Sequence, residues 1–440
     1  MSASAEIVII GGGVIGASTA YHLAAKGATS VMLLERGGLA SGETGKSGGF
    51  IQTHWDSLDE VRLIARSRDV FARWRDEIGG DCGFVRGGYL HVTGVERLAG
   101  VRAVHDMLVR EGLESQWLDP EQLSSLQPLL HVEDLAGGAW EPASGWANPL
   151  AATRSLAEAA RRRGVALRED TRVVRIVHDH GRVTGVETEA GVIACRVAIL
   201  AAGPWTPRLH ALPEVPLPIT LRRGQVCYLD RPSGFPRREI GFYDEITGLY
   251  THPSGDTNFV GIDYKLGEVQ DPDDYVRTVD ADYCTALLGK LAVRFPPLAP
   301  SRIVRGVVGL YDFTPDGQPI VDAMPGLAGY YVAAGFSGVG FKSAPATGLG
   351  LAELVLDGKP SSVAIDHLAL ARFSAQPPAG ISPELIAKLS AVRELLSVDE
   401  QARLIPYVMT LAPDQLAAFA ALLVTRSPAE LAAELRARLA

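Results

Sequence analysis

The chain has 440 residues, 47% of them hydrophobic and 21% charged, which is enough to bury a large core in two or three domains. It carries 42 basic and 51 acidic residues, a formal charge of −9, and therefore lacks the basic field that nucleic acids or anionic membranes require. The four cysteines form no Cys-x-x-Cys pair, so neither a metal site nor a redox dithiol is expected. No basic leader precedes Glu6, which indicates a cytoplasmic protein without a membrane segment.

The N-terminal residues have the pattern of a β-α-β unit. Glu6–Ile10 is predicted to be a buried strand, Val14–Lys26 a helix closed by Gly27, and Ser30–Leu34 a second strand. The unit begins only a few residues into the chain. It is the first place to look for a nucleotide site.

The turn between this strand and helix, Gly11 to Gly16, matches the pattern G-x-G-x-x-G. Gly11 permits a tight turn, Gly13 lets the backbone approach a pyrophosphate, and Gly16 lets the helix pack on the strand. The helix N-terminus offers amide donors to phosphates. Glu35 follows Gly16 by 19 positions, where an acid binds ribose hydroxyls. The motif predicts a bound dinucleotide, without deciding between FAD and NAD.

Further elements follow in the middle of the chain. A capping box at Ser57 to Glu60 begins a helix that is predicted to reach about Ile78, and Asn148-Pro149 begins another that Gly164 ends. Val165–Leu200 alternates short strands with turns, which predicts a small β layer. Residues 216–275 are rich in β-formers and turn residues and predict an antiparallel sheet.

The C-terminal part contains one more buried strand and then changes in composition. Tyr330–Ala334 is predicted to be that strand, followed by a glycine-rich turn and a helix to about Leu356. After the linker at 376–380 the chain becomes rich in Ala, Leu, Glu and Arg. Capping boxes at Ser397 and Ser427, and a helix start at Ala412-Pro413, predict an appendage of three or four helices.

The apolar strand Val197–Leu200, which ends in Ala201-Ala202-Gly203-Pro204-Trp205, favours FAD. In flavoproteins with a dinucleotide fold such a strand returns to the cofactor, although an ordinary buried strand has the same composition. The chain has no second complete G-x-G-x-x-G for NADPH. Electrons are therefore expected to come from an organic substrate.

Taken together, the motifs resemble the D-amino-acid oxidase superfamily, most closely its sarcosine oxidase and glycine oxidase branch. The resemblance covers about residues 5–373. Beyond the fingerprint and Trp205 segment, it rests on Ala40–Gly49, Val173, Arg223-Gly224-Gln225, Thr314–Ile320 and Ala334–Lys342.

The resemblance implies FAD bound without a covalent link. The segment from Ser41 to Ser47 would cross the pyrophosphate and run beside the isoalloxazine, and Val173 would contact the adenine end. Gly335–Lys342 would pass the pyrimidine edge of the flavin. The implied cofactor residues are Gly11, Gly13, Val14, Ile15, Gly16, Glu35, Arg36, Ser41, Thr44, Gly45, Lys46, Ser47, Gly48, Val173, Ala202, Gly203, Trp205, Gly335, Ser337, Gly338, Val339, Gly340, Phe341 and Lys342.

The sequence departs from the monomeric sarcosine oxidases at several site positions. The lysine that holds the substrate carboxylate is present as Lys342, but its arginine partner falls on Gln52. The cysteine that carries covalent flavin falls on Gly309. A lysine that activates oxygen falls on Phe259, and an active-site histidine on Asp263.

The candidate catalytic residues are Lys46, Tyr250 and Lys342, and the candidate substrate-binding residues are Gln52, His54, Tyr250, Asp263 and Lys342. Tyr250 matches a substrate-site tyrosine of the family. Lys46 would place a cation near the flavin N5 or the pyrophosphate. The alternatives are solvated lysines, a core tyrosine, and a packed aromatic pair of His54 and Trp55.

We therefore expect a Rossmann-like α/β FAD-binding domain, discontinuous in sequence, an antiparallel-sheet substrate domain and a C-terminal helical appendage. The FAD-binding parts are about 1–85, 145–215 and 300–375, the substrate parts about 86–144 and 216–299, and the appendage 376–440.

The resemblance implies oxidation of an amine or amino acid by hydride transfer to flavin N5. The resulting imine would hydrolyse, and O2 would be reduced to H2O2. Two alternatives remain open. One is a dehydrogenase of the same fold that passes electrons to a partner protein or a quinone. The other is a binding role in which residues 381–440 dock a carrier with a tethered substrate.

Overall fold

The computed structural model describes residues 4–232, 240–373, 392, 422 and 426–439. Contacts divide the chain into two compact units, Met1–Leu370 and Ala371–Ala440. In the second unit the described helix is α13, Pro428–Leu439. The predicted capping box at Ser427 is formed, because its hydroxyl accepts from Glu430 N at 3.4 Å while the Glu430 carboxylate accepts from Ser427 N at 2.9 Å. The predicted helix starts at Ser397 and Ala412 lie outside the described residues.

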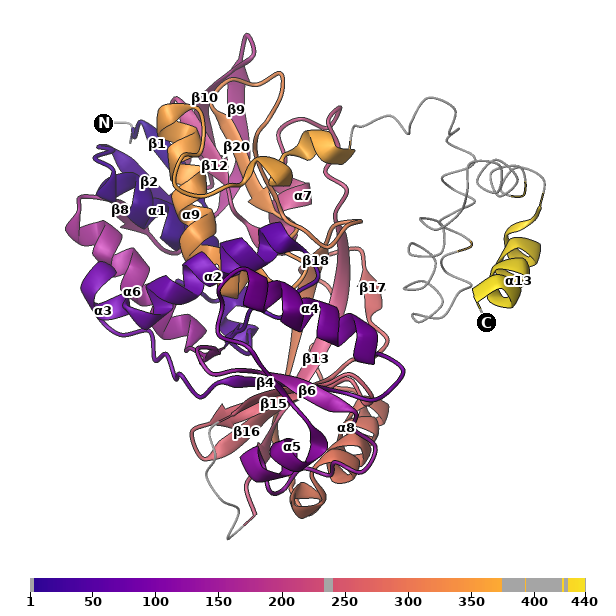
Figure 1. The fold of residues 1–440 in the computed structure, drawn as a ribbon. Helices are drawn as coiled ribbons and strands as arrows, with labels where there is room; N and C mark the ends of the chain where they lie inside the picture. The colour runs from indigo at the N-terminus through magenta and orange to yellow at the C-terminus, as the bar shows by residue number, and fades with distance from the viewer. Residues whose placement is uncertain (1–3, 233–239, 374–391, 393–421, 423–425, 440) are drawn as a thin grey trace. The chain divides into compact units, whose positions relative to one another are not determined.

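A six-stranded, mainly parallel sheet forms the nucleotide-binding half of the first unit (Figure 1). The predicted β-α-β unit is present to within a residue or two at each boundary. The sheet order is β19-β20-β12-β1-β2-β8, and only β19 runs antiparallel to its neighbour. The strands are β1 Ile7–Ile10, β2 Val31–Leu34, β8 Ala166–Arg168, β12 Val197–Leu200, β19 Ile320–Ala323 and β20 Tyr330–Ala334.

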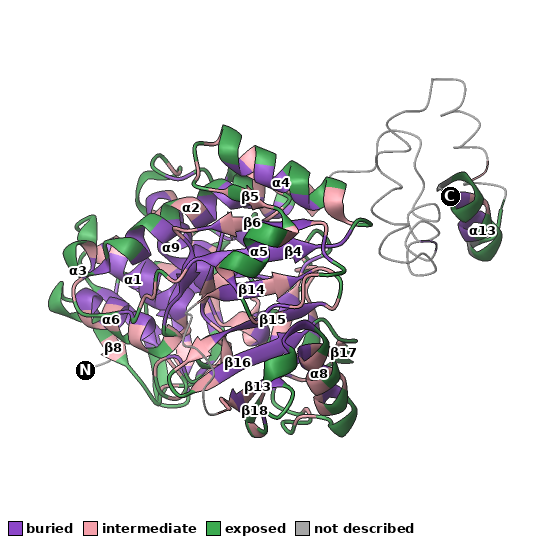
Figure 2. Ribbon diagram, turned by 60° about the horizontal axis from the view of Figure 1, so that its bottom comes forward, coloured by how far each residue is buried: buried purple, intermediate pink, exposed green. Residues whose placement is uncertain are grey.

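Three long helices pack together against this sheet (Figure 1). They are α1 Val14–Ala25, α6 Pro149–Arg162 and α9 Gly340–Asp357, and α2, Leu58–Ala72, packs against α9. Ile9, Leu23 and Leu33, from β1, α1 and β2, are fully buried in the shared core. Figure 2 shows α1 and α9 as largely buried. Each Å² of apolar surface removed from water contributes about 25 cal/mol of free energy, and this burial holds the helices on the sheet.

Two predictions for this half need correction. The helix expected from Leu58 to about Ile78 breaks at Arg73, and a short helix α3, Trp74–Glu77, follows. The break lets the Trp74 indole donate to Ser155 Oγ at 2.9 Å. The strands of Val165–Leu200 do not form one layer, because the first and last, β8 and β12, join the parallel sheet. The middle three form a small antiparallel sheet, β9 Val173–Asp179, β10 Arg182–Thr188 and β11 Gly191–Ala194.

A nine-stranded sheet forms the other half of the first unit. Its order is β17-β13-β16-β15-β14-β4-β6-β5, with β18 paired to β13. The predicted antiparallel strands of 216–275 are present, but the sheet also takes in strands outside that range, and β14 pairs with β4 in parallel. The strands are β4 Tyr89–Thr93, β5 Gln116–Leu118, β6 Gly137–Glu141, β13 Thr220–Asp230, β14 Gly241–Asp244, β15 Leu249–Ser254, β16 Thr257–Ile262, β17 Gly267–Val269 and β18 Ile303–Phe313.

Strand β18 belongs to this sheet although it falls in the range expected for FAD binding. It pairs with β13 from Leu229↔Ile303 to Thr220↔Phe313. Helix α8, Ala281–Arg294, buries Tyr283, Leu287 and Leu291 in the core of this half. Besides short 3-10 turns, the remaining described elements are α4 Leu98–Arg110, α5 Pro120–Leu126, α7 Thr206–Leu209, and a two-stranded ladder of β3 Phe50–Ile51 with β7 Gly145–Trp146. Among the described residues, no helix is both long and apolar enough to cross a membrane.

Truncation after Ala375 should leave a folded protein that retains its cofactor. The fingerprint and both large sheets lie within Met1–Leu370, so removal of the tail takes no residue from either core. We expect the unfolding temperature to change by no more than about 2 °C, measured by calorimetry on the full and truncated chains. Aggregation of the truncated protein, or loss of its yellow colour, would show that the tail is part of the fold.

Candidate active site

A cavity of about 920 Å³ lies at the carboxyl ends of the parallel strands. Its wall includes Gly11 after β1, Glu35 after β2 and Ala201 after β12. Strands β13, β15, β16 and β18 of the large sheet contribute the opposite side, with Tyr250 among their residues. Ligands of open α/β sheets bind at this edge, where the strands end and the helices begin. The volume lies in the upper range for small-molecule sites.

The turn between β1 and α1 is shaped for a phosphate. Gly11 has φ +114°, and a Cβ there would lie 2.3 Å from the carbonyl oxygen of Ala201. Gly16 lies so close to Gly11 that a Cβ would meet its carbonyl oxygen at 2.0 Å, which fixes the helix on the strand. Gly13 and Val14 line the cavity at the N-terminus of the twelve-residue helix α1. The positive end of the helix dipole can therefore face an anion there, although Val14 N already donates to Thr44 Oγ1 at 3.1 Å.

The predicted ribose acid, Glu35, also organises the turn. Its carboxylate accepts from Gly12 N at 2.7 Å and from Gly37 N at 2.9 Å. Each carboxylate oxygen has further lone pairs with which to accept from a ribose hydroxyl. The Arg36 guanidinium lies 3.8 Å above the Trp205 ring, and Val173 is a buried wall residue. These residues fit the adenosine half of a dinucleotide.

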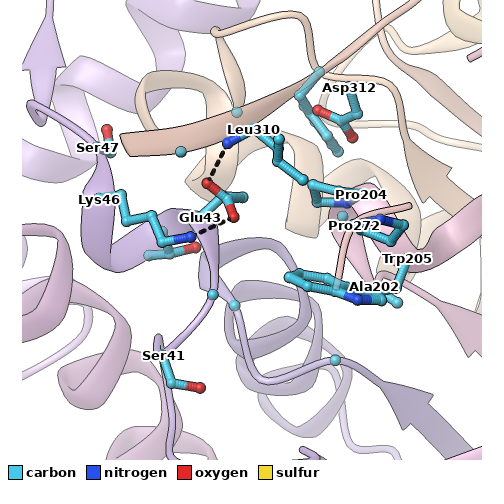
Figure 3. A pocket seen from close by; sticks show the side chains of 18 of the residues that line it. Ser41, Glu43, Lys46, Ser47, Ala202, Pro204, Trp205, Pro272, Leu310 and Asp312 are labelled. Carbon is cyan, nitrogen blue, oxygen red and sulfur yellow. Dashed lines mark hydrogen bonds and ion pairs between the residues drawn. The ribbon is translucent and has the colours of Figure 1, made fainter. Parts of the chain in front are cut away.

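The segment Ser41–Ser47 forms a single 3-10 turn, Glu43–Lys46, beside the cavity. The Glu43 carboxylate accepts from Leu310 N at 2.7 Å and from Lys46 Nζ at 2.8 Å (Figure 3). Lys46 also donates to the Tyr275 hydroxyl at 2.9 Å. Burial disfavours the charged ammonium, but the pairing with Glu43 and the bond to Tyr275 outweigh it and raise the pKa of Lys46. Lys46 is therefore a paired cation.

Glu43 also explains Gly309, the position of the family's flavin-linked cysteine. A Cβ on Gly309 would lie 2.6 Å from Glu43 Oε2. No side chain fits there while Glu43 holds Leu310. The motif containing Glu43 was recognised in the sequence, but its role was not, because Leu310 is 267 positions away.

Four aromatic residues, Phe50, Tyr250, Phe259 and Tyr311, line another part of the cavity and are called the aromatic wall. The rings of Phe50, Tyr250 and Phe259 lie 5.9–6.2 Å apart. Tyr250 and Tyr311 are joined by a hydrogen bond between their hydroxyls. The wall is thus apolar with one fixed polar point. Gly48 lies against it, since a Cβ there would meet the Phe259 ring at 2.6 Å.

Lys342 is a buried wall residue in the first turn of α9. Its Nζ lies 4.5 Å from the centre of the Trp55 ring, a cation–π contact. Burial lowers the pKa of Lys342 to about 8, and the nearby carboxyls of Glu60 and Glu141 oppose this effect. Burial likewise raises the pKa of Glu60 to about 7, with Lys342 opposing. The ammonium therefore shares its surroundings with two carboxyl groups.

Three predicted substrate residues do not line the cavity. Gln52 is buried and hydrogen-bonded to Tyr89, and His54 is buried with Nδ1 4.0 Å from Glu141 Oε1. Burial holds the pKa of His54 well below 6.5, so its ring is neutral. Asp263 is an exposed residue after β16 that accepts from the Tyr243 hydroxyl at 2.6 Å.

Most predicted cofactor residues do line the cavity. The five that do not line it are each next in sequence to a wall residue. They are Gly16, Gly45, Gly335, Ser337 and Val339. The wall also includes residues that the sequence did not predict, among them Glu43, Asp273, Tyr311 and Asp312. Asp312 accepts from Gly335 N at 2.8 Å, and burial raises its pKa to about 6. Glu43 lies within the recognised segment Ala40–Gly49, but no local pattern singles out Asp273, Tyr311 or Asp312.

The chain is similar to several known proteins. A family model described as FAD dependent oxidoreductase (DAO) matches residues 6–354. The mitochondrial pyruvate dehydrogenase phosphatase regulatory subunit of Mus musculus is 31% identical over 386 residues, covering 85% of this chain and 44% of that protein. Mitochondrial sarcosine dehydrogenase of Mus musculus is 30% identical over 373 residues, covering 82% and 40%. The chain thus spans less than half the length of these relatives.

Among solved structures, L-proline dehydrogenase from P. horikoshii superposes with a TM-score of 0.79 at 27% identity. The match covers 85% of this chain and 99% of that one. The similarity therefore extends over both halves of the first unit.

We expect the flavin to be released when the protein is denatured. No cysteine or histidine occurs among the described residues that line the cavity, and Gly309 offers no thiol. After acid precipitation, the absorbance at flavin wavelengths should remain in the supernatant. Yellow colour in the washed pellet would reveal a covalent link to another residue.

Proposed function

Because the chain belongs to the DAO family of FAD-dependent oxidoreductases, we propose that it oxidises an amine or amino acid at the carbon next to nitrogen. The observation that carries the proposal is one continuous cavity. Its wall combines the dinucleotide turn at Gly11 with the aromatic wall and the buried Lys342. Bound FAD would supply a two-electron acceptor for the hydride that leaves this carbon.

The predicted resemblance to the D-amino-acid oxidase superfamily is confirmed, as are the enzyme class and FAD as cofactor. The Rossmann-like fold is confirmed as well. The fit of the wall residues agrees with this cofactor, since the α1 N-terminus can receive the pyrophosphate and Glu35 a ribose.

In the proposed reaction the aromatic wall holds the reacting amine in a dry environment. The amine has to be unprotonated, because its nitrogen lone pair assists the departing hydride. Phe50 and Phe259 exclude water and so disfavour the ammonium form. The hydroxyl pair of Tyr250 and Tyr311 supplies a polar group to orient the nitrogen. The imine would then hydrolyse in water. In a separate step, O2 would accept the two electrons taken from the amine and be reduced to H2O2.

The charges around Lys342 argue for a substrate other than a small free amino acid. Lys342 lines the cavity, whereas Gln52, at the position of the family's carboxylate-binding arginine, lies behind the wall and bonds to Tyr89. Glu60 and Glu141 already attract the ammonium. A substrate carboxylate therefore meets one partly compensated cation. Proline and sarcosine, named in two of the similar proteins, are secondary amines, and we propose a larger or tethered secondary amine as the substrate.

Glycine and sarcosine should be poor substrates. A charge-assisted hydrogen bond contributes about 1.5–3 kcal/mol, so the missing arginine weakens carboxylate capture about tenfold or more. The measurement is the rate of flavin bleaching when the enzyme is mixed without oxygen with a panel of amines. Larger secondary amines should bleach the flavin faster than sarcosine does. Efficient reduction by sarcosine at low concentration would contradict the proposal.

A dehydrogenase that passes electrons to a partner protein or a quinone is the second candidate. The position at which oxidases of the family carry an oxygen-activating lysine is here Phe259, which packs against Gly48. The cation Lys46 is paired with Glu43. Electron transfer to O2 forms superoxide, which a nearby uncompensated cation stabilises. The paired charge of Lys46 weakens this effect, so the choice of acceptor depends on that residue.

Lys46→Met should slow the reaction of reduced enzyme with O2 and leave anaerobic reduction by substrate nearly unchanged. The reason is that a cation beside the flavin acts on superoxide formation alone. Stopped-flow mixing measures the two half-reactions separately. Glu43→Gln is the matched variant, because it keeps an oxygen for Leu310 N and removes the counterion of Lys46. It should speed reoxidation. A fall in both rates for Lys46→Met would instead assign the residue to cofactor positioning.

A binding role is the third candidate, supported by the relative that is a phosphatase regulatory subunit. In that case residues 381–440 would dock a carrier or partner protein. Flavin that no amine of the panel reduces, together with partner capture that depends on residues 381–440, would favour this role over catalysis.

A further inference from the structure

The connection between β17 and α8 runs along the cavity. Pro272, Asp273 and Tyr275 are wall residues, although they lie far in sequence from every cofactor motif. Pro272 is seen with Trp205 and Pro204 in Figure 3. We call the segment Asp271–Tyr275 the strap. It belongs to the half of the unit built on the large sheet, whereas the residues it contacts belong mostly to the nucleotide-binding half.

Asp273 joins three residues of the nucleotide-binding half. Its Oδ1 accepts from Arg36 at 2.9 Å and from the Trp205 indole at 2.9 Å, and its Oδ2 accepts from Arg208 at 2.8 Å. Arg208 also donates to Asp271 at 2.6 Å. Because Arg36 stacks on Trp205 at 3.8 Å, one carboxylate fixes both members of that stack. Arg36 follows Glu35, so these contacts lie on the ribose side of the site.

The chain that follows the strap is anchored to the large sheet, whereas Tyr275 itself accepts from Lys46 of the nucleotide-binding half, as described above. The Arg223 side chain donates to Val276 O at 2.8 Å and to Asp280 at 2.7 Å, and also to Thr278 O. Gln225 donates to Asp280 at 2.8 Å. The motif Arg223-Gly224-Gln225, which has no place in the proposed chemistry, therefore holds the strap's C-terminal continuation.

We propose that the strap retains FAD, and that Asp273 is the positioning residue on which its closure depends. Its bonds hold Arg36 and Trp205 against the adenosine half of the cofactor. They have to break for FAD to enter or leave, whereas the anchor at Arg223 keeps the strap in place when they do. The side chains of Arg36, Asp273 and Arg208 are 37–43% exposed, so salt reaches and screens these pairs.

The test measures FAD release from the holoenzyme, diluted to low concentration, by the rise in fluorescence of free flavin. Asp273→Asn should speed release about tenfold, because it removes the negative charge that pairs with both Arg36 and Arg208, although its amide oxygen can still accept from Trp205. Asp273→Glu should restore most of the retention. Asp274→Asn is the matched control: it changes the neighbouring residue by the same chemistry, and Asp274 does not line the cavity.

Salt separates the strap from a general loss of folding. Raising the ionic strength to about 1 M should speed release from the wild-type protein more than from Asp273→Asn, in which only the pair of Arg208 with Asp271 remains to be screened. The proposal would be overturned if Asp273→Asn released FAD at the wild-type rate, or if Asp274→Asn accelerated FAD release as much as Asp273→Asn does. The same is true if salt acts equally on wild type and Asp273→Asn. Since no substrate takes part, these outcomes are independent of the proposed oxidation.

Discussion

The contact between Gly11 and Ala201 is the constraint on which the site depends. The ends of two parallel strands, β1 and β12, approach so closely that a Cβ on Gly11 would overlap the Ala201 carbonyl. Gly16 brings α1 equally close to the same turn. The N-terminus of the helix is thereby placed at the edge of the sheet, and the cavity is built around it. A side chain at either glycine would push the helix away from the strand and move the amide donors with it.

The two halves of the first unit are joined across the cavity by polar contacts. Glu43 comes from the nucleotide-binding half and accepts from Leu310 in β18, while the strap reaches in the opposite direction to Arg36. Apolar cores hold each half, and Phe50 also packs against Tyr250 and Phe259 of the large sheet. Partly exposed ion pairs can open and reform at low free-energy cost. This division suits a protein that has to be stable and still admit a large ligand.

The sequence predicts local features well and long-range ones poorly. The β-α-β unit is specified by glycine spacing and apolar runs over about thirty residues, so its boundaries are nearly right. The pairing of β18 with β13 and the bond from Arg36 to Asp273, 237 positions apart, depend on residues that no local pattern connects. Asp263, at the position of the family's active-site histidine, lies on the surface beside Tyr243.

The carboxyl groups of Glu60 and Glu141 near Lys342 link the fold to the choice of substrate. Helix α2 brings Glu60, and β6 brings Glu141, near the first turn of α9. Below about pH 7 Glu60 is protonated and Lys342 is charged, so an anionic group is favoured at this point of the wall. As the pH rises, Glu60 loses its proton and Lys342 its charge, so an anionic group becomes less favourable there. The charge at this point of the wall therefore depends on two groups, Glu60 and Lys342, whose pKa values lie close to neutral pH.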